Sequence, residues 1–349
     1  MHNPLQVLKH YWGYDGFRPG QAEVIDSILS GHDTLALMPT GGGKSITFQV
    51  PALANPGICL VISPLVALMK DQVKNLQKRG ILSAFISSEM PHWEILQQLD
   101  NCILGDYKLL YISPERISSE LFQEKLKTLS RKVNLLVVDE AHCISQWGND
   151  FRRDYRLIAD IRDAIPHVQV IAVTASATAA VVADICEQLH FRKGYRIFKT
   201  SFERKNLSFV VRKTDNKLKE ICHILSAVPG SAVIYSRTRK GVEEYAGKLR
   251  AAGISAEYFH AGLDPVLKTE RQADWVKGFT RVLVATNAFG MGIDKGDVRV
   301  VIHTEFPDSM EAYYQEAGRA GRDGKRAYAV ALLGPQDITD IKRLSLIHI

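Results

Sequence analysis

The chain has 349 residues, more than one ordinary core holds, so we expect two domains of roughly 100–200 residues each. The sequence is 46% apolar and 23% charged, which is typical of a globular protein, and no run of about 18 apolar residues suggests a membrane span or a membrane partner. The N-terminal residues lack the apolar stretch of a signal peptide, so we expect a cytoplasmic protein.

Net charge and cysteine content bear on the kinds of partner, metal site and disulfide that we expect. The formal net charge of +6 and the isoelectric point near 8.9 permit an anionic partner such as nucleic acid without requiring one. The five cysteines are widely spaced and form no C-x-x-C pair: Cys59, Cys102, Cys143, Cys186 and Cys222. We therefore expect reduced structural thiols, and neither a zinc site nor a disulfide framework.

Short apolar runs recur in two series and predict parallel strands alternating with helices. The first series covers residues 33–38, 57–63, 108–113, 135–140 and 169–176. The second covers residues 231–236, 255–260, 281–286 and 298–303. Between them, the charged stretch 191–209 has no long apolar run of helical period. The pattern predicts an α/β fold of two doubly wound parallel-sheet domains, residues 1–205 and 206–343.

The first strand is followed by MPTGGGKS, residues 38–45, and then by a predicted helix, which is the context of a phosphate-binding loop. Here Lys44 would reach the β- and γ-phosphates, and Ser45 would bind Mg²⁺. The backbone of four residues would form the phosphate cradle: Thr40, Gly41, Gly42 and Gly43. Because Met38 stands where the strict G-x-x-x-x-G-K-[ST] pattern has glycine, an ordinary glycine turn is the alternative.

Two adjacent acids, Asp139 and Glu140, end a strand that is apolar enough to be buried. Such a pair is costly unless a metal or a water uses it. We expect Asp139 to hold Mg²⁺, directly or through water, and Glu140 to orient and deprotonate the water that attacks ATP. Polar or glycine-rich segments also follow most of the other strands, where ligands bind in open α/β sheets.

Phosphoryl transfer also requires positive charge on the γ-phosphate. In QEAGRAGRDG, residues 315–324, Arg319 and Arg322 lie three apart on a predicted short helix ending in glycine, so they share a face. A solvated basic turn is the alternative, but a hydrolysis site divided between two domains needs such a pair in the second. We therefore expect ATP to close a cleft between the domains and hydrolysis to reopen it.

These segments together resemble the superfamily-two helicases and, within them, the DExH-box RecQ family of DNA helicases, over nearly the whole chain. Order and spacing agree for FRPGQ (17–21), MPTGGGKS (38–45), SPLVALMKDQV (63–73), SPER (113–116), DEAHCISQWGNDFR (139–152), TASAT (174–178), YSRTRK (235–240), FHAGL (259–263), ATNAFGMGIDK (285–295) and QEAGRAGRDG (315–324). The resemblance implies two tandem RecA-like domains with the ATP site in the cleft between them.

The resemblance also implies roles around the nucleotide. Tyr14 would stack on adenine, Arg18 would support that site and Gln21 would hydrogen-bond the base, which explains a preference for ATP. Gln315 would join the catalytic residues. Gly292 and Asp294 would link the nucleotide site to a nucleic-acid groove.

The family's aromatic-rich loop corresponds to residues 144–152. Four of its residues would contact single-stranded DNA and report it to the catalytic acid: Gln146, Trp147, Phe151 and Arg152. The alternative is a buried helical stripe, since Trp147, Phe151 and Tyr155 are spaced by four. Aromatic rings beside arginines suit base stacking and phosphate neutralisation, so we favour the DNA role. The family commonly has histidine at Asn149 and proline at Arg153, so this loop departs from the family pattern at two positions.

Strand-end residues of both domains would line a groove along the phosphate backbone: Ser63, Pro64, Ser113, Arg116, Ser236, Arg237, His260 and Thr286. Backbone contacts carry no base information, so we expect no sequence specificity. For the isolated serines, capping of the following helix is an equal alternative.

The sequence thus predicts a monomeric ATP-dependent DNA helicase that acts on single-stranded and tailed duplex DNA in repair and recombination. Movement from 3′ to 5′ comes wholly from the resemblance. A translocase or RNA remodeller that does not separate strands, and a catalytically idle DNA-binding scaffold, are the alternatives. Residues 344–349, LSLIHI, do not resemble the family's continuation into a zinc-binding module and a winged helix. We expect them to be non-native, with a genuine apolar tail as the alternative.

Overall fold

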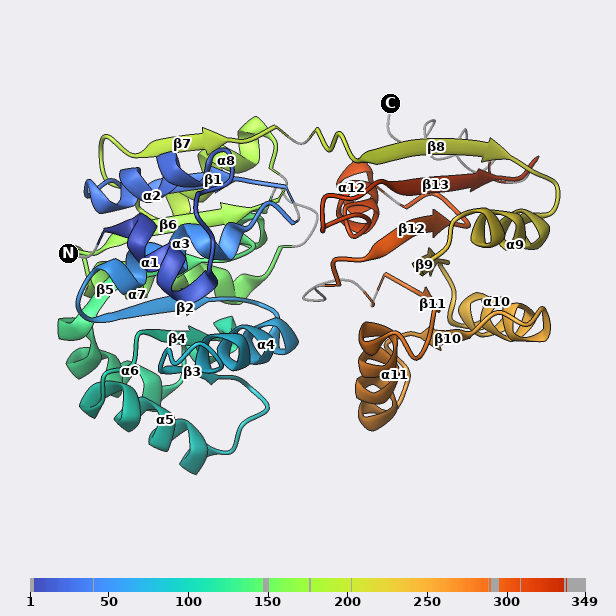
Figure 1. Cartoon of the computed structure of the whole chain (residues 1–349). Helices are drawn as coiled ribbons and strands as arrows, with labels where there is room; N and C mark the ends of the chain where they lie inside the picture. The colour runs from blue at the N-terminus through green and yellow to red at the C-terminus, as the bar shows by residue number, and fades with distance from the viewer. Residues whose placement is uncertain are drawn as a thin grey trace. The chain divides into compact units, whose positions relative to one another are not determined.

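The protein folds as two compact units, residues Met1–Phe202 and Glu203–Ile349, each built on its own sheet (Figure 1). The computed structural model describes residues 3–39, 41–146, 151–175, 177–201, 203–287, 289, 295–307, 309–335 and 337. Within these ranges no helix is both long enough and apolar enough to cross a bilayer. Residues 344–349, predicted to be non-native, lie outside them.

The described part of the first unit forms a seven-stranded parallel sheet in the order β3-β4-β2-β5-β6-β1-β7. Its strands are β1 (Thr34–Leu37), β2 (Ile58–Ile62), β3 (Ser83–Ile86), β4 (Leu109–Ile112), β5 (Val133–Val138), β6 (Gln169–Thr174) and β7 (Arg196–Lys199). The central strands are buried on both faces, which is why they are near-continuous runs of Val, Ile and Leu.

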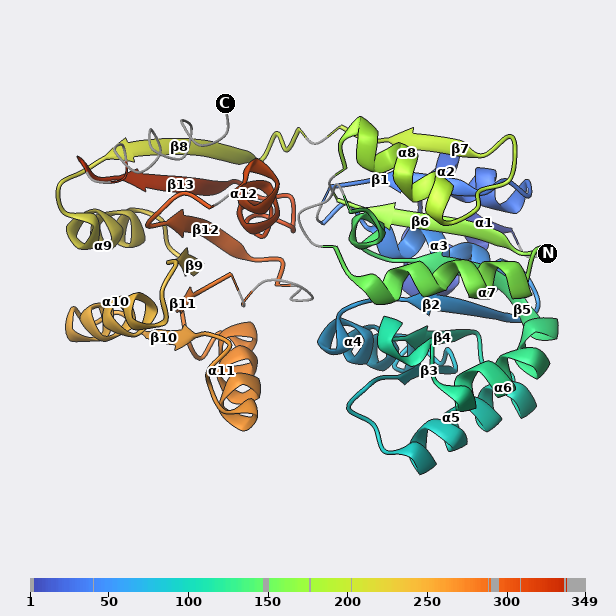
Figure 2. The same cartoon turned by 180° about the vertical axis from the view of Figure 1, so that it is seen from behind.

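Helices cover both faces of this sheet, as the opposite views of Figures 1 and 2 show. One face packs on α1 (Pro4–Trp12), α2 (Gln21–Leu29), α3 (Lys44–Ala54) and α4 (Val66–Gln77). The other packs on α5 (His92–Leu104), α6 (Glu120–Leu129), α7 (Ile158–Ala164) and α8 (Ala179–Gln188). Successive strand residues alternate between the two cores: Cys59 and Val61 face the first set, whereas Leu60 and Ile62 face the second.

The described part of the second unit forms a six-stranded parallel sheet in the order β10-β11-β9-β12-β13-β8. Its strands are β8 (Leu207–Lys213), β9 (Ser231–Tyr235), β10 (Ala256–Phe259), β11 (Val282–Ala285), β12 (Val298–His303) and β13 (Ala327–Leu333). Helices α9 (Lys217–Ala227) and α10 (Arg239–Ala251) cover one face. Helices α11 (Pro265–Lys277) and α12 (Met310–Ala317) cover the other.

The predicted fold class is therefore confirmed, since both units are parallel-sheet α/β domains. Every strand predicted from the sequence occurs, but β3, β7, β8 and β13 were not predicted. Three of these lie at sheet edges, where one side is solvated and the apolar run is short or interrupted. The charged stretch 191–209 accordingly contains all of β7 and the start of β8.

Candidate nucleotide and nucleic-acid sites

The predicted phosphate loop connects β1 to α3, and its three glycines stand where a side chain would be strained or would clash. Gly41 and Gly43 have φ of 79° and 76°, and a Cβ on Gly43 would overlap Nε2 of Gln21. A Cβ on Gly42 would lie 2.9 Å from the carbonyl oxygen of Pro39. The loop ends at the N-terminus of α3, where unpaired N–H groups and the helix dipole favour an anion. Ser45 lies in that first turn, and Thr40 lies outside the described residues.

Two residues at the start of α2 and just before it, Gln21 and Arg18, hold this loop from outside. Arg18 donates through Nη1 to the carbonyl of Gly41 at 2.9 Å, and Gln21 donates through Nε2 to the carbonyl of Gly43 at 3.0 Å. Gln21 also accepts the Arg18 backbone N–H at 2.8 Å, and only 3% of its surface is exposed. Both residues thus touch the phosphate loop itself. Tyr14, predicted to stack on adenine, is 52% exposed.

Asp139 lies at the carboxyl end of β5, and both its oxygens are hydrogen-bonded. Oδ2 accepts the Ser63 hydroxyl at 3.2 Å, and Oδ1 accepts the Glu140 backbone N–H at 3.0 Å. Burial raises the pKa of Asp139 to about 6, with a further rise from Glu140 that Lys44 opposes. The carboxylate form therefore prevails above that pH. Ser63, predicted for the nucleic-acid groove, is 1% exposed and directs its hydroxyl to this acid.

Glu140 connects the phosphate loop to the end of β6. Its φ of 46° and ψ of 48° are left-handed values that a residue with a Cβ rarely adopts. Oε1 of Glu140 lies 3.6 Å from Nζ of Lys44, and Oε2 lies 3.6 Å from Nδ1 of His142. The same Nδ1 lies 2.8 Å from the hydroxyl of buried Thr174. His142 and Thr174 had no predicted role, although both stand in segments that carry the family resemblance.

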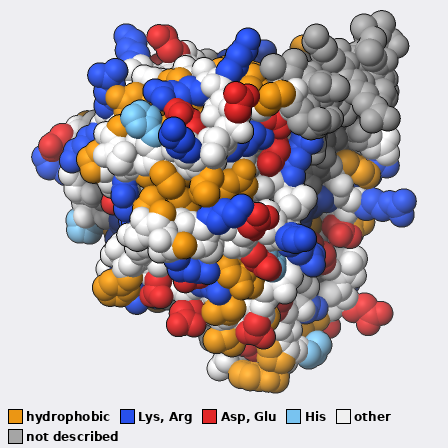
Figure 3. Space-filling model, turned by 90° about the vertical axis from the view of Figure 1, so that its right-hand side faces the viewer, with side chains coloured by type: hydrophobic (Ala, Val, Ile, Leu, Met, Phe, Trp, Pro, Cys, Tyr) orange, Lys and Arg blue, Asp and Glu red, His pale blue; other side chains and the backbone are white. Residues whose placement is uncertain are grey.

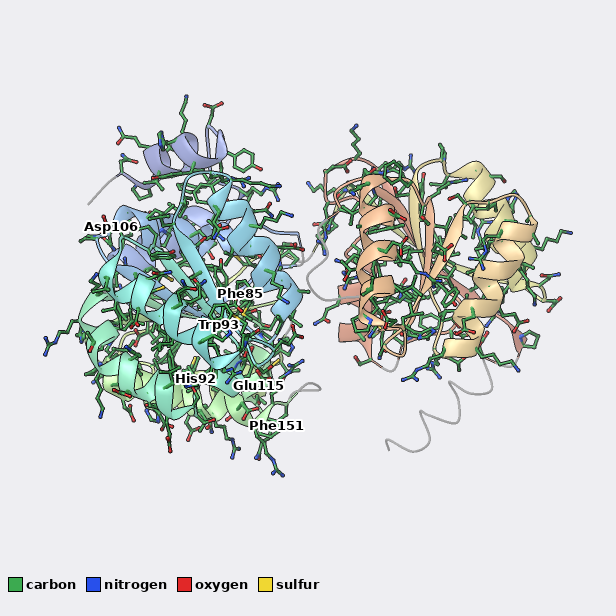
Figure 4. The ribbon with its side chains drawn as sticks, turned by 90° about the horizontal axis from the view of Figure 1, so that it is seen from below. Phe85, His92, Trp93, Asp106, Glu115 and Phe151 are labelled. Carbon is green, nitrogen blue, oxygen red and sulfur yellow. The ribbon has the colours of Figure 1, made fainter. Side chains whose placement is uncertain are left out.

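The aromatic-rich loop is described only at its ends, because Trp147 and residues 148–150, Asn149 among them, lie outside the described residues. Gln146 is exposed, and Phe151 is partly exposed at the outside of the first unit, with the Arg156 guanidinium 5.3 Å from its ring centre (Figure 4). Arg152 donates to the carbonyl of Pro64 at 3.4 Å. Tyr155 is fully buried and donates its hydroxyl to the carbonyl of Asp139 at 2.9 Å.

The alternative of one buried helical stripe does not describe residues 151–155. Phe151 and Arg152 precede a 3₁₀ helix, Arg153–Leu157, and only Tyr155 of the two described aromatic residues belongs to the core.

The remaining predicted groove residues lie at carboxyl strand ends, mostly with buried side chains. In the first unit Ser113 is fully buried, and Arg116 donates to the carbonyls of Ser87 at 2.9 Å and Ser88 at 3.0 Å. In the second unit three residues are 6–7% exposed: Ser236, His260 and Thr286. Arg237 is exposed and donates to the Phe306 carbonyl at 2.6 Å. Gly292 and Asp294 lie outside the described residues.

The two predicted catalytic arginines follow a helix instead of lying on it. Helix α12 ends at Ala317, and residues 318–324, here named the arginine loop, continue as turns. The prediction of a shared helical face was therefore wrong. Arg319 is 8% exposed and lies beside Tyr235, whose pKa burial raises to about 12 while Arg319 opposes the rise. Gln315 is partly buried in the last turn of α12.

The oxygen ligands near the phosphate loop suit Mg²⁺. In the described ranges no group of three or more His, Cys, Asp and Glu side chains could hold a metal ion by itself. The Ser45 hydroxyl and the Asp139 carboxylate are hard oxygen donors, and Mg²⁺ is commonly held by one or two such groups together with substrate phosphates. The residues present therefore fit a phosphate-bound magnesium ion.

Comparison with known proteins places this geometry in a family. Residues 18–185 match the DEAD/DEAH box helicase family, and residues 216–324 match the helicase conserved C-terminal domain. The ATP-dependent DNA helicase RecQ of Bacillus subtilis (strain 168) is 44% identical over 341 residues, which cover 97% of this chain and 57% of that protein. The probable ATP-dependent DNA helicase RecS of the same strain is 39% identical, with 95% of this chain and 67% of that protein covered.

A solved structure shows the same architecture. The Mycobacterium smegmatis helicase Lhr, bound to single-stranded DNA and AMP-PNP, matches with a TM-score of 0.75 and 20% identity over 99% of this chain and 51% of that one. This likeness supports the fold, and the chain spans little more than half the length of its RecQ relative. Sequence identity over nearly the whole chain, together with the two matched domains, shows that the chain belongs to the RecQ family of DEAD/DEAH-box helicases, as its sequence predicted.

Proposed function

We propose that the chain is the core of an ATP-dependent DNA helicase that moves 3′ to 5′ on single-stranded DNA and unwinds tailed duplexes in repair and recombination. The observation that carries this proposal is a chain of side-chain contacts beside Asp139, because it joins the lysine of the phosphate loop to a pair of acids. The chain runs through Lys44, Glu140, His142 and Thr174. The RecQ and RecS relatives are named ATP-dependent DNA helicases, which supports DNA over RNA as the substrate.

Hydrolysis would use residues from both units. Lys44 and the N–H groups of the phosphate loop bind the phosphates. Ser45 and Asp139 would hold Mg²⁺, which would neutralise charge on the phosphate oxygens. Glu140 orients the attacking water and takes its proton. In the second unit Arg319 and Arg322 stabilise charge on the transferred phosphate, with Gln315 nearby in sequence.

The base of ATP would be recognised beside the phosphate loop by Tyr14, Arg18 and Gln21. Because Arg18 and Gln21 already contact carbonyls of the loop, a base bound to the Gln21 amide would also affect the phosphate cradle. These two contacts support a connection from the bound base to the hydrolysis site.

Nucleic acid would follow the carboxyl strand ends of both sheets, with the aromatic-rich loop as the sensor. Two hydrogen bonds support a connection from that loop to Asp139: Arg152 contacts Pro64, directly after Ser63, and Tyr155 contacts the Asp139 carbonyl. The face of the second unit drawn in Figure 3 mixes basic, acidic and hydrophobic side chains. The Lhr structure holds single-stranded DNA, which agrees with this substrate.

The test is to measure ATP hydrolysis and strand displacement on one preparation, with single-stranded DNA, RNA and a 3′-tailed duplex as cofactors. We expect DNA-stimulated hydrolysis and ATP-dependent displacement, both lost in Glu140→Gln. Stimulation without displacement indicates a translocase, and stimulation by RNA alone indicates an RNA remodeller. DNA binding without any hydrolysis would establish the idle scaffold instead.

A further inference from the structure

The chain that enters β8 holds the arginine loop, residues 318–324, in place. Arg204 donates from its guanidinium to three carbonyls of this loop, those of Gly318 at 3.4 Å, Ala320 at 2.9 Å and Gly321 at 2.6 Å. The Asn206 amide donates to the Gly321 carbonyl at 2.7 Å. Figures 1 and 2 both show the start of β8 next to α12, the helix that leads into the loop.

These contacts fix the turns that follow the helix. Helix α12 ends at Ala317, and the three carbonyls that Arg204 binds come after it, where a planar guanidinium can hold several carbonyls in one fixed direction. Bonds from a charged donor are also stronger than bonds between neutral groups. Gly321 has φ of 62°, and a Cβ there would lie 2.6 Å from the Asn206 amide nitrogen and 2.8 Å from Cβ of Ala327. The loop backbone therefore follows one path.

The two predicted catalytic arginines lie on this held backbone. Arg319 stands between the carbonyls of Gly318 and Ala320, and Arg322 directly follows Gly321. Arg319 is 8% exposed, and its buried Nε has no acceptor within the part of the chain that the structure describes. A shift in the backbone would thus displace both guanidinium groups at once.

We propose that Arg204, together with Asn206, is a positioning residue that fixes the arginine loop so that Arg319 and Arg322 reach the transferred phosphate. The inference rests on the proposed function, which assigns those two arginines to ATP hydrolysis. Arg204 binds carbonyls of the backbone that carries the arginines, and it acts through that backbone.

The chain offers a matched control. Arg281 also binds three backbone carbonyls, those of Gly230 at 3.1 Å, Val228 at 3.1 Å and Leu225. It immediately precedes β11 (Val282–Ala285), which β9 and β12 separate from β13 in the sheet, and the three carbonyls that it binds belong to residues 225–230. Substitution of Arg281 therefore removes the same kind of contact without touching the arginine loop.

The experiment compares Arg204→Lys with Arg281→Lys in the full chain. Lysine keeps the charge but loses the planar fork. We expect Arg204→Lys to lower kcat about 10- to 100-fold, the cost of misplacing a catalytic group by about 1 Å. The KM for ATP, DNA affinity and the unfolding midpoint should match those of Arg281→Lys, whose kcat stays near that of the parent.

A double-mutant cycle separates positioning from general loss of structure. If Arg204 acts through the arginines, Arg204→Ala should cost much less kcat in an Arg322→Ala background than in the parent. Equal losses in both backgrounds, or the same loss in Arg281→Lys, would overturn the inference. If Arg204→Lys keeps the parental kcat while Arg322→Ala loses most of its activity, the positioning role of Arg204 is wrong and the proposed role of Arg322 stands. Parental kcat in Arg322→Ala overturns the proposed arginine role and the positioning role with it.

Discussion

At the scale of single residues, substitutions at the phosphate loop should have different effects on ATP binding and on hydrolysis. Nζ of Lys44 and Oε1 of Glu140 lie 3.6 Å apart, yet the two residues serve different steps in the proposed mechanism. One binds the phosphates before reaction, and the other acts on the water during it. Substitution of Lys44 and substitution of Glu140 should therefore change ATP affinity differently, although both abolish turnover.

Lys44→Ala should weaken ATP binding and abolish hydrolysis, because it removes positive charge from the phosphate cradle. Glu140→Gln should abolish hydrolysis and retain ATP binding, because glutamine keeps the shape of glutamate without its basicity. Equilibrium binding of a fluorescent ATP analogue, followed beside phosphate release, checks both. Equal losses of affinity in the two variants would contradict the assigned roles.

Gly43→Ala should lose ATP binding, because the added methyl group meets both an unfavourable φ of 76° and the Gln21 amide. Gly80→Ala is the matched control, since Gly80 has a φ of 75° with no atom within 4 Å of the added Cβ. The control should cost about 1 kcal/mol of stability through φ alone and keep ATP binding. Similar ATP affinity in both variants would show that contact with Gln21 does not shape the loop.

At the scale of secondary-structure elements, the sequence predicted those whose function or burial leaves a strong pattern. Apolar runs marked the central strands, and the phosphate loop and acid pair were placed correctly at strand ends. Edge strand β7 was not predicted because most of its side chains are exposed. Strand β13, AYAVALL, is an apolar run like the central strands, and the two predicted series of strands do not include it.

Long-range hydrogen bonds were the features that no local pattern could supply. The contact of His142 with Thr174 spans 32 positions, and that of Arg204 with Gly321 spans 117. Nor does residue type alone show that Ser63 faces Asp139 instead of solvent. Such pairings depend on which strands become neighbours, and that follows only from the assembled sheet.

Tyr155→Phe should test the connection between the 3₁₀ helix Arg153–Leu157 and the end of β5. The ring stays buried while the hydroxyl that bonds the Asp139 carbonyl is lost, so unfolding free energy should fall by about 1 kcal/mol. Stimulation of hydrolysis by single-stranded DNA should fall more than basal hydrolysis does. Chemical denaturation and ATPase titration with DNA measure the two effects. Equal stimulation in parent and variant would show that this bond carries no coupling.

At the scale of the whole molecule, the burial of the cysteine thiols indicates how completely the cores of the two units are packed. Four of the five cysteines are buried, and only Cys222 is partly exposed. Burial raises the pKa of Cys102 to about 12 and that of Cys186 to about 11. Since the thiolate is the reactive form, these two thiols should be almost unreactive at pH 8.

Titration of the native protein with a thiol reagent at pH 8 should therefore label Cys222 first, and the other four only after unfolding. Because both quoted pKa values are raised, reactivity of those thiols should increase as pH approaches 11 to 12. Peptide mapping by mass spectrometry identifies the labelled positions. Rapid labelling of several buried cysteines in the native state would show that the units open more readily than their cores suggest.

The last prediction concerns whether one chain makes a whole hydrolysis site. The acids belong to the first unit and the arginines to the second, and the predicted monomer requires that both come from the same molecule. Glu140→Gln should be inactive, Arg322→Ala should keep only a small residual rate, on the order of a thousandth of the parent's, and a mixture of the two should show no more than that residual rate at any ratio. If the site instead formed between chains, pairing an intact first unit of one variant with an intact second unit of the other would restore hydrolysis. Parent chain diluted with either variant serves as the positive control, and its activity should fall only in proportion to its share. Activity that rises on mixing, and rises further with protein concentration, would replace the monomer with an oligomer whose subunits share their sites.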